Sequence, residues 1–312
     1  MNILYAGTPS SSARILRFLA EMKPFNIKGV LTQPDKKGKR GNNLLESPVA
    51  IAAKDLKLEV FKHENLNSKE ALNSLGLLDI DFLVVIAYGK IIPPWLLELP
   101  SESSINIHFS LLPKYRGASP IQSALLNGDD TSGISIIKMS EDLDSGDIIS
   151  SFIVRIKPED NKSTLENKLT NKCIIELPRT LELVKANKIE AKKQDHSSAS
   201  YCKKITKSDS IIDFNETTIN IINKFRAFYG WPGTSFIYND IQIKIHNMVE
   251  AKIINRGKPG TIYKLNNDGL YINTIDSMIV ITHLQFPNKN IISSNDVFNS
   301  YKDFFHKDKF LQ

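Results

Sequence analysis

The chain has 312 residues, of which 41% are hydrophobic and 24% charged, so it is not an extended disordered chain and can form two domains. Its formal net charge of +6 is a mild basic excess that identifies no partner by itself. Only two cysteines are present, Cys173 and Cys202, and their wide separation predicts neither a disulfide framework nor a metal site.

The N-terminal residues 1–7 run directly into a strand-like segment, without the basic start and apolar run of a signal peptide. The following turn, Ala6-Gly7-Thr8-Pro9, lacks the Gly-x-Gly-x-x-Gly fingerprint of dinucleotide-binding proteins. No window reaches the length of a membrane span. We therefore expect a soluble cytoplasmic protein that neither binds NAD nor contacts a membrane.

Strand-like and helix-like segments alternate through the first half of the chain. Strands are expected at residues 3–6, 27–32, 81–87, 105–108 and 133–139, and helices at residues 12–22 and 121–126. This order predicts an α/β, Rossmann-like domain over residues 1–187, with a mostly parallel sheet and helices on both faces. Ligands of such sheets bind beyond the carboxyl ends of the strands, where Tyr88 and His108 are expected.

The pattern changes after about residue 187. A lysine-rich and serine-rich stretch predicts a basic linker over residues 188–206. Segments of period two then follow at residues 236–245, 260–263, 269–275 and 278–284, separated by turn signals such as Asn239-Asp240. Short strands with turn punctuation predict a smaller antiparallel β-barrel of OB type over residues 207–312.

Basic residues are concentrated in two places. The first cluster contains Lys36, Lys37, Lys39 and Arg40, and the second contains seven lysines between residues 185 and 207, with Lys203, Lys204 and Lys207 at its end. Either cluster taken alone is as compatible with a solvated surface as with a polyanionic partner.

The segment from Asn106 to Gly117 carries the strongest chemical pattern. Residues two apart on a strand face the same side, so Asn106 and His108 are expected to project together. The amide could donate to a developing oxyanion, and the imidazole could transfer a proton, as acyl transfer requires. A single histidine at a strand end is also compatible with a structural role.

A polar turn at residues 141–147 could supply a carboxylate that orients His108. It contains four acids, Glu141, Asp142, Asp144 and Asp147. Spacing alone does not select Asp144 among them.

A longer pattern resembles the 10-formyltetrahydrofolate-dependent formyltransferases. It comprises Asn106-x-His108, Ser110-Leu111-Leu112-Pro113, Arg116-Gly117, Pro120-Ile121-Gln122 and Leu143-Asp144-Ser145-Gly146-Asp147. The resemblance implies that Asn106 stabilises the oxyanion, His108 transfers protons and Asp144 orients His108, with 10-formyltetrahydrofolate as co-substrate and no metal. It also implies folate contacts at Ser110, Leu111, Leu112, Pro113, Tyr88, Gly89, Ile91 and Ile92.

Some members of that family formylate methionyl initiator tRNA, and these carry a basic loop and a C-terminal barrel for the RNA. The resemblance therefore implies this acceptor, a role in translation initiation and a monomeric enzyme. The implied RNA contacts are Lys36, Lys37, Lys39, Arg40, Lys203, Lys204 and Lys207.

Two alternative functions remain open on the sequence. One keeps the chemistry and changes the acceptor to an amino-sugar nucleotide or glycinamide ribonucleotide, against which the basic loop and the barrel argue. The other is a non-catalytic RNA-binding protein, against which the complete set of Asn106, His108 and Asp144 argues.

Overall fold

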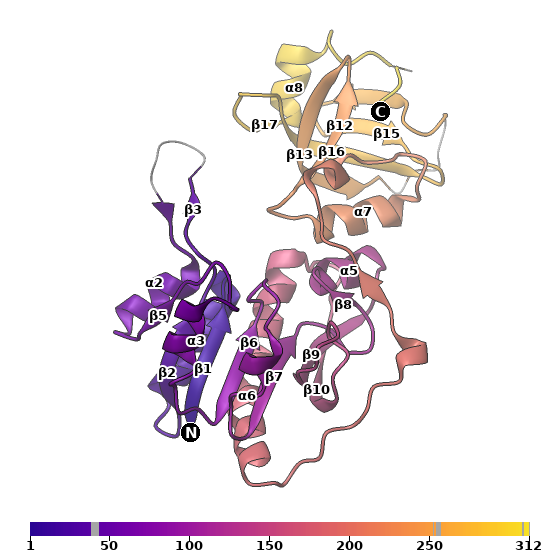
Figure 1. Ribbon diagram of the computed structural model, residues 1–312. Coiled ribbons are helices and arrows are strands. Elements are labelled where there is room, and N and C mark those ends of the chain that lie inside the picture. The colour runs from indigo at the N-terminus through magenta and orange to yellow at the C-terminus, as the bar shows by residue number, and fades with distance from the viewer. Residues whose placement is uncertain (39–43, 252, 254–256, 308, 312) are drawn as a thin grey trace. The chain divides into compact units, whose positions relative to one another are not determined.

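The computed structural model describes residues 1–38, 44–251, 253, 257–307 and 309–311 (Figure 1). The chain forms two compact units, and it passes between them more than once. Unit 1 contains Met1–Pro120, Thr131–Arg155 and Glu166–Cys202, and unit 2 contains Ile121–Asp130, Ile156–Leu165 and Lys203–Gln312. Among the described residues, no helix is both long enough and apolar enough to cross a membrane.

A seven-stranded sheet with the order β10-β9-β7-β6-β1-β2-β5 forms the centre of unit 1. Its strands are β1 (Asn2–Gly7), β2 (Asn26–Leu31), β5 (Val60–Phe61), β6 (Phe82–Ile86), β7 (Ser103–His108), β9 (Thr131–Lys138) and β10 (Ile148–Arg155). The neighbouring pairs β5–β2, β2–β1, β1–β6 and β6–β7 are parallel. In contrast, β9 is antiparallel to β7, and β10 is antiparallel to β9. The mostly parallel sheet is therefore confirmed.

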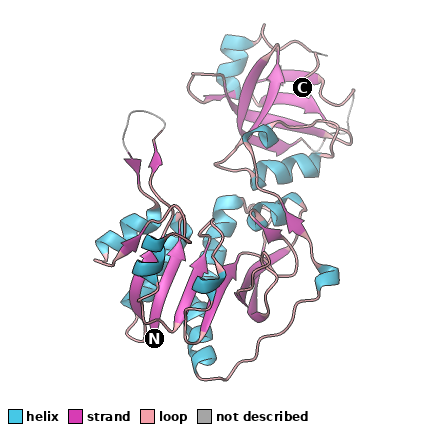
Figure 2. Ribbon diagram, in the orientation of Figure 1, coloured by secondary structure: helices cyan, strands magenta, loops and turns pink. Residues whose placement is uncertain are grey.

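Helices flank this sheet (Figure 2). They are α1 (Ser10–Glu21), α2 (Pro48–Asp55), α3 (Lys69–Leu75), α4 (Pro94–Leu97) and most of α6 (Lys162–Lys185). The central strand β6 is buried along its whole length, which explains its continuous apolar sequence. Between β1 and α1, a Cβ on Gly7 would collide with the Ser12 hydroxyl, so this glycine allows a tight strand-to-helix turn.

The end of unit 1 is a strap, residues 192–202, which lies within the predicted basic linker. Its first residue, Lys192, pairs with Ile148 in an antiparallel bridge. Its last two residues form β11 (Tyr201–Cys202), which pairs in parallel with β8 (Arg116–Gly117). The strap is thus hydrogen-bonded to unit 1 at both of its ends.

A six-stranded antiparallel sheet forms the core of unit 2, with the order β12-β13-β16-β15-β14 and β17 paired to β16. The strands are β12 (Thr234–Tyr238), β13 (Ile241–Glu250), β14 (Ile262–Asn266), β15 (Gly269–Asn273), β16 (Met278–Gln285) and β17 (Ile292–Ser293). Unit 2 also contains α7 (Thr218–Ala227), α8 (Ser294–Tyr301) and most of α5 (Pro120–Leu126). The antiparallel C-terminal sheet is confirmed.

The segment predicted at residues 236–245 spans parts of two strands. Asn239 and Asp240 join β12 to β13, and both have positive φ, at 50° and 61°. Two consecutive residues of positive φ are typical of the tight hairpin turns that match the twist of antiparallel strands. The Asn239-Asp240 turn signal was therefore the better guide to the strand boundary.

Candidate active site

Asn106 and His108 lie at the carboxyl end of β7, where the parallel part of the sheet meets its antiparallel part. Asn106 is paired with Val85 of β6 on one side and with Ile137 of β9 on the other. His108 is 6% exposed and lies opposite Ser135 of β9. Strand pairing on both sides at Asn106, and with β9 at His108, therefore fixes the backbone that carries both functional groups.

Asp144, in the turn between β9 and β10, brings these two side chains together. Its Oδ1 accepts a hydrogen bond from Asn106 Nδ2 at 3.1 Å. Its Oδ2 accepts one from the Gly117 backbone N–H at 2.8 Å and lies 3.5 Å from His108 Nδ1. One carboxylate thus contacts the predicted amide, the predicted imidazole and the loop that follows them.

The second ring nitrogen of His108 is also held. His108 Nε2–H donates to the Tyr115 carbonyl oxygen at 2.8 Å, since a carbonyl can only accept. Nδ1, which faces Asp144, is therefore the nitrogen that can take up a proton. Asn106 Nδ2 carries two hydrogens and uses one on Asp144, so the other can reach a developing oxyanion.

A buried amide holds the backbone of the Asp144 turn. Gln194 Nε2 donates to the carbonyl oxygens of Asp144 at 2.8 Å and Gly146 at 2.7 Å. Gln194 Oε1 accepts from Arg116, from Nη2 at 2.7 Å and from Nε at 3.2 Å. Gln194 is 5% exposed and Arg116 is 2% exposed, so solvent competes little for these bonds.

No local sequence pattern predicts a role for Gln194. It lies 50 residues beyond Asp144 in the chain and stands between the charged residues Lys193 and Asp195. Arg116 belongs to the motif that resembles the formyltransferases, but that motif assigns it no role. Its position directly before Gly117, whose N–H binds Asp144, is the one signal that could have drawn attention to it.

Hydrogen bonds fix the backbone of the predicted folate-contact loop, Ser110 to Pro113. Ser110 Oγ donates to the Lys114 carbonyl at 2.6 Å. Ser135 Oγ donates to the Ser110 carbonyl at 2.8 Å and accepts from the Leu112 N–H at 2.9 Å. The Leu112-Pro113 peptide is cis. Leu112 is buried, while Leu111 and Pro113 are partly exposed.

The second predicted folate-contact loop, Tyr88 to Ile92, exposes mainly backbone groups. Tyr88 and Ile92 are buried in the core, and burial raises the pKa of Tyr88 to about 12. Gly89 has a φ of 80° and is exposed, and Ile91 is 90% exposed. Backbone groups and the Ile91 side chain are therefore what this loop presents to a ligand.

The predicted RNA contacts lie in both units. Lys36 and Lys37 form β3, whose exposed side chains belong to a hairpin with β4 (Leu44–Leu45). Lys39 and Arg40 lie outside the described residues. In unit 2, Lys203, Lys204 and Lys207 are exposed.

Ion pairs join the two sides of the hairpin base. Lys62 Nζ lies 2.7 Å from Asp35 Oδ1, just before β3, and 2.6 Å from Glu46 Oε1, just after β4. Hydrogen bonds from Lys54 and Lys62 lower the pKa of Glu46 to about 2. Ion pairs therefore hold together the base of the hairpin that carries Lys36 and Lys37.

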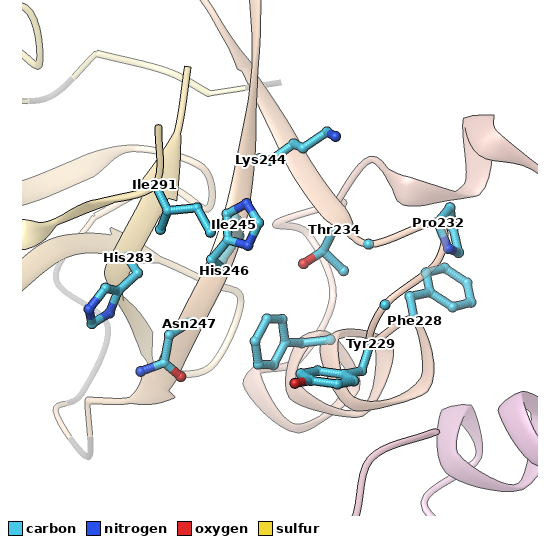
Figure 3. A pocket seen from close by; sticks show the side chains of 13 residues that line it. Phe228, Tyr229, Pro232, Thr234, Lys244, Ile245, His246, Asn247, His283 and Ile291 are labelled. Atoms are coloured by element: carbon cyan, nitrogen blue, oxygen red, sulfur yellow. The ribbon is translucent and has the colours of Figure 1, made fainter. Parts of the chain in front are cut away.

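A separate cavity of about 550 Å³ lies entirely within unit 2 (Figure 3). Its lining includes Phe228 and Tyr229 after α7, His246 on β13 and His283 on β16. It contains none of the predicted catalytic residues. Among the described residues, no group of three or more His, Cys, Asp or Glu side chains could hold a metal ion.

Comparisons with known proteins agree with this arrangement. Residues 1–181 match the family described as formyl transferase, and residues 204–302 match the formyl transferase C-terminal domain. A methionyl-tRNA formyltransferase of Legionella pneumophila subsp. pneumophila is 34% identical over 312 residues, with 100% of this chain and 99% of the relative covered. One of Thermotoga sp. (strain RQ2) is 39% identical over 295 residues, with 93% and 92% covered.

A solved structure also shares the fold. The N-formyltransferase from Helicobacter canadensis, in complex with folinic acid and dTDP-3-aminofucose, has a TM-score of 0.66 at 20% identity, with 89% of this chain and 98% of that chain covered. Two matching domain models and relatives that align along nearly the whole chain lead to one conclusion. The chain belongs to the formyl transferase family.

Proposed function

We propose that this enzyme transfers the formyl group of 10-formyltetrahydrofolate to the α-amino group of methionyl initiator tRNA and so supports translation initiation in the cytoplasm. The observation that carries the proposal is the Asp144 carboxylate, which contacts Asn106 and His108 at the end of β7. Relatives named methionyl-tRNA formyltransferases, aligned over nearly the whole chain, support the choice of acceptor.

The proposed reaction needs groups that handle one oxyanion and one proton. The neutral amine attacks the formyl carbon, and the carbonyl oxygen becomes an oxyanion. Collapse of this intermediate breaks the bond between the formyl carbon and N10 of the folate. The amine loses one proton and N10 gains one, so the transfer needs no external acid or oxidant.

Each of the three side chains has a distinct part in this scheme. The free N–H of Asn106 would stabilise the oxyanion, a contact that strengthens as negative charge develops. His108 would accept the amine proton at Nδ1 and pass it to N10, directly or through a water. Asp144 would hold the imidazole in place and face its positive charge at 3.5 Å.

Binding of the two substrates would involve different parts of the chain. The loops from Ser110 to Pro113 and from Tyr88 to Ile92 would border the folate. The exposed lysines of the β3–β4 hairpin, together with Lys203, Lys204 and Lys207, would contact RNA phosphates. The corresponding domains would be a catalytic domain at residues 1–187, a basic linker at 188–206 and an RNA-binding domain at 207–312.

The test is an acceptor comparison with 10-formyltetrahydrofolate as the donor. Release of tetrahydrofolate is measured with methionyl initiator tRNA, with the same tRNA uncharged, with a dTDP-amino sugar and with glycinamide ribonucleotide. We expect turnover with the charged tRNA alone. Turnover with the dTDP-amino sugar or the ribonucleotide, and none with charged tRNA, would contradict the proposed acceptor while keeping the chemistry.

A further inference from the structure

The strap at residues 192–202 reaches the two residues that flank the His108 ring. Gln194 binds the backbone of the Asp144 turn, and Asp144 faces His108 Nδ1. At the other end of the strap, Ser200 Oγ accepts a hydrogen bond from the Tyr115 N–H at 2.9 Å. The Tyr115 carbonyl in turn accepts from His108 Nε2. Both nitrogens of the imidazole therefore face residues that the strap holds.

Both held residues have an unfavourable backbone conformation. Asp144 has a φ of 51° and Tyr115 a φ of 61°, in the left-handed region. That conformation costs a non-glycine residue about 1–2 kcal/mol, so surrounding contacts must maintain it. For Asp144 these include the hydrogen bonds from Gln194 to its own carbonyl and to that of Gly146, and for Tyr115 they include the one to Ser200. The strap thus stabilises the positive-φ conformations of Asp144 and Tyr115, the two residues on either side of the His108 ring.

The strap contacts the rest of unit 1 at several residues along its length, including Tyr201, which accepts a hydrogen bond from Arg116. Lys192, Gln194, His196, Ser200 and Cys202 each have a partner in unit 1. Among the described residues, Asp195 accepts hydrogen bonds only from the neighbouring Ser197 and Ser198, in the turn that the strap makes between its two contact points. The strap is therefore attached at both contact points, on either side of His108.

We propose that Gln194 and Ser200 are positioning residues of the formyl transfer site, acting on His108 through Asp144 and Tyr115 respectively. This inference rests on the proposed function. It assigns a catalytic contribution to a strap that composition alone would describe as a basic linker. Misplacement of a catalytic group by about 1 Å can reduce turnover by roughly 10²-fold.

Gln194→Glu is the sharpest variant for the first contact. Glutamate has nearly the same size and keeps an oxygen for Arg116, but it loses both hydrogens and places a carboxylate oxygen against two carbonyls. We expect kcat to fall by roughly 10–100-fold with little change in the KM for the folate substrate. Glu190→Gln, an exposed charge change just before the strap, is the matched control and should keep wild-type kcat.

Ser200→Ala tests the second contact. It leaves the Tyr115 N–H without its partner, while the Ser200 backbone still pairs with Pro113 and Arg116. We expect a decrease in kcat of about 3–10-fold, smaller than for Gln194→Glu because those backbone bonds remain. The control is Ser198→Ala, which removes an exposed hydroxyl bonded to Asp195 on the same strap.

A double-mutant cycle separates positioning from general stability. If Gln194 acts through Asp144, Gln194→Glu should cost little further kcat in an Asp144→Asn background. Additive losses, or losses that disappear at a temperature well below the melting transition, would overturn the proposal. Unchanged kcat in both Gln194→Glu and Ser200→Ala would overturn it as well.

Imidazole NMR gives a readout that does not depend on the reaction. In the full-length wild-type protein we expect the His108 ¹⁵N spectrum to show the Nε2–H form, and we expect Gln194→Glu and Ser200→Ala to change its shifts. The control variants should leave them unchanged. A wild-type enzyme inactive on methionyl-tRNA with these shifts intact would refute the proposed function alone. Unaltered His108 shifts in both strap variants would refute the positioning role alone.

Discussion

The site around Asp144 in unit 1 and the cavity in unit 2 differ in how completely their polar side chains are hydrogen-bonded and buried. Around Asp144, Asn106 bonds to the Asp144 carboxylate, Arg116 bonds to Gln194, and Gln194 bonds to the Asp144 backbone, and most of this network is buried. The cavity is lined by aromatic rings and exposed histidines (Figure 3). At its edge, the buried Thr234 hydroxyl has no hydrogen-bond partner among the described residues.

This difference distinguishes a preorganised site from a surface hollow. Preorganised donors cost no rearrangement when charge develops in a transition state, which is where most electrostatic catalysis originates. A network of this kind is also sensitive, because removing one member leaves buried partners unsatisfied. Variants in the two regions should therefore differ in both turnover and stability.

The largest difference is expected in turnover. His108→Ala removes the proposed proton-transfer group and should lower kcat for formyl transfer by roughly 10²–10⁴-fold. His283→Ala, at the exposed cavity in unit 2, should leave kcat within about twofold of wild type. Steady-state kinetics at saturating folate substrate measure both. Equal losses in the two variants would remove the distinction between the regions.

Asn106→Ala should come next in size. It removes the amide hydrogen proposed for the oxyanion, and loss of one such donor costs roughly 10²–10³-fold in kcat. It also leaves Asp144 Oδ1 without its donor, so the melting temperature must be recorded for the same preparation. Asn247→Ala, on the cavity lining, is the matched control. A wild-type kcat in Asn106→Ala would show that the oxyanion is stabilised elsewhere.

Stability should show the same contrast on a smaller scale. Ser135→Ala leaves the Leu112 N–H and the Ser110 carbonyl without their buried partner, which should cost about 1–3 kcal/mol in the free energy of unfolding. Thr234→Val removes a buried hydroxyl that bonds to nothing among the described residues, so its effect should be neutral or stabilising. Thermal denaturation of both variants tests this prediction. A destabilised Thr234→Val would show that the Thr234 hydroxyl does have a hydrogen-bond partner.

Sequence periodicity predicted the elements that carry the chemistry better than the contacts between them. The strand ending at His108 and the turn containing Asp144 were both located, because apolar runs and polar turns are local signals. The 24-residue helix α6 was not predicted, and its internal Pro178 is a residue that usually interrupts helices.

Sequence periodicity could not predict contacts between residues that are far apart in the chain. The bond from Gln194 to Asp144 joins residues 50 positions apart, and no spacing rule relates them. For Asp144 itself, the family pattern was needed to select it among neighbouring acids. The structure adds the physical reason, since the Asp144 carboxylate contacts Asn106, Gly117 and His108 together.

The smallest expected effect concerns RNA attraction by the β3–β4 hairpin. Lys36 and Lys37 are exposed and contact no part of the Asp144 network in the described structure, so replacing both with alanine should leave kcat unchanged. Each lost phosphate contact should reduce the slope of log binding affinity against log salt by about 1, with a loss of only a few-fold in affinity at physiological salt. Binding of initiator tRNA is measured across a salt series, with Lys28→Ala and Lys57→Ala combined as the control for net charge. An identical decrease in the control would mean that general charge, not this hairpin, attracts the RNA. A decrease confined to the hairpin variant would show that the RNA is bound through this hairpin while the chemistry at His108 proceeds unaltered.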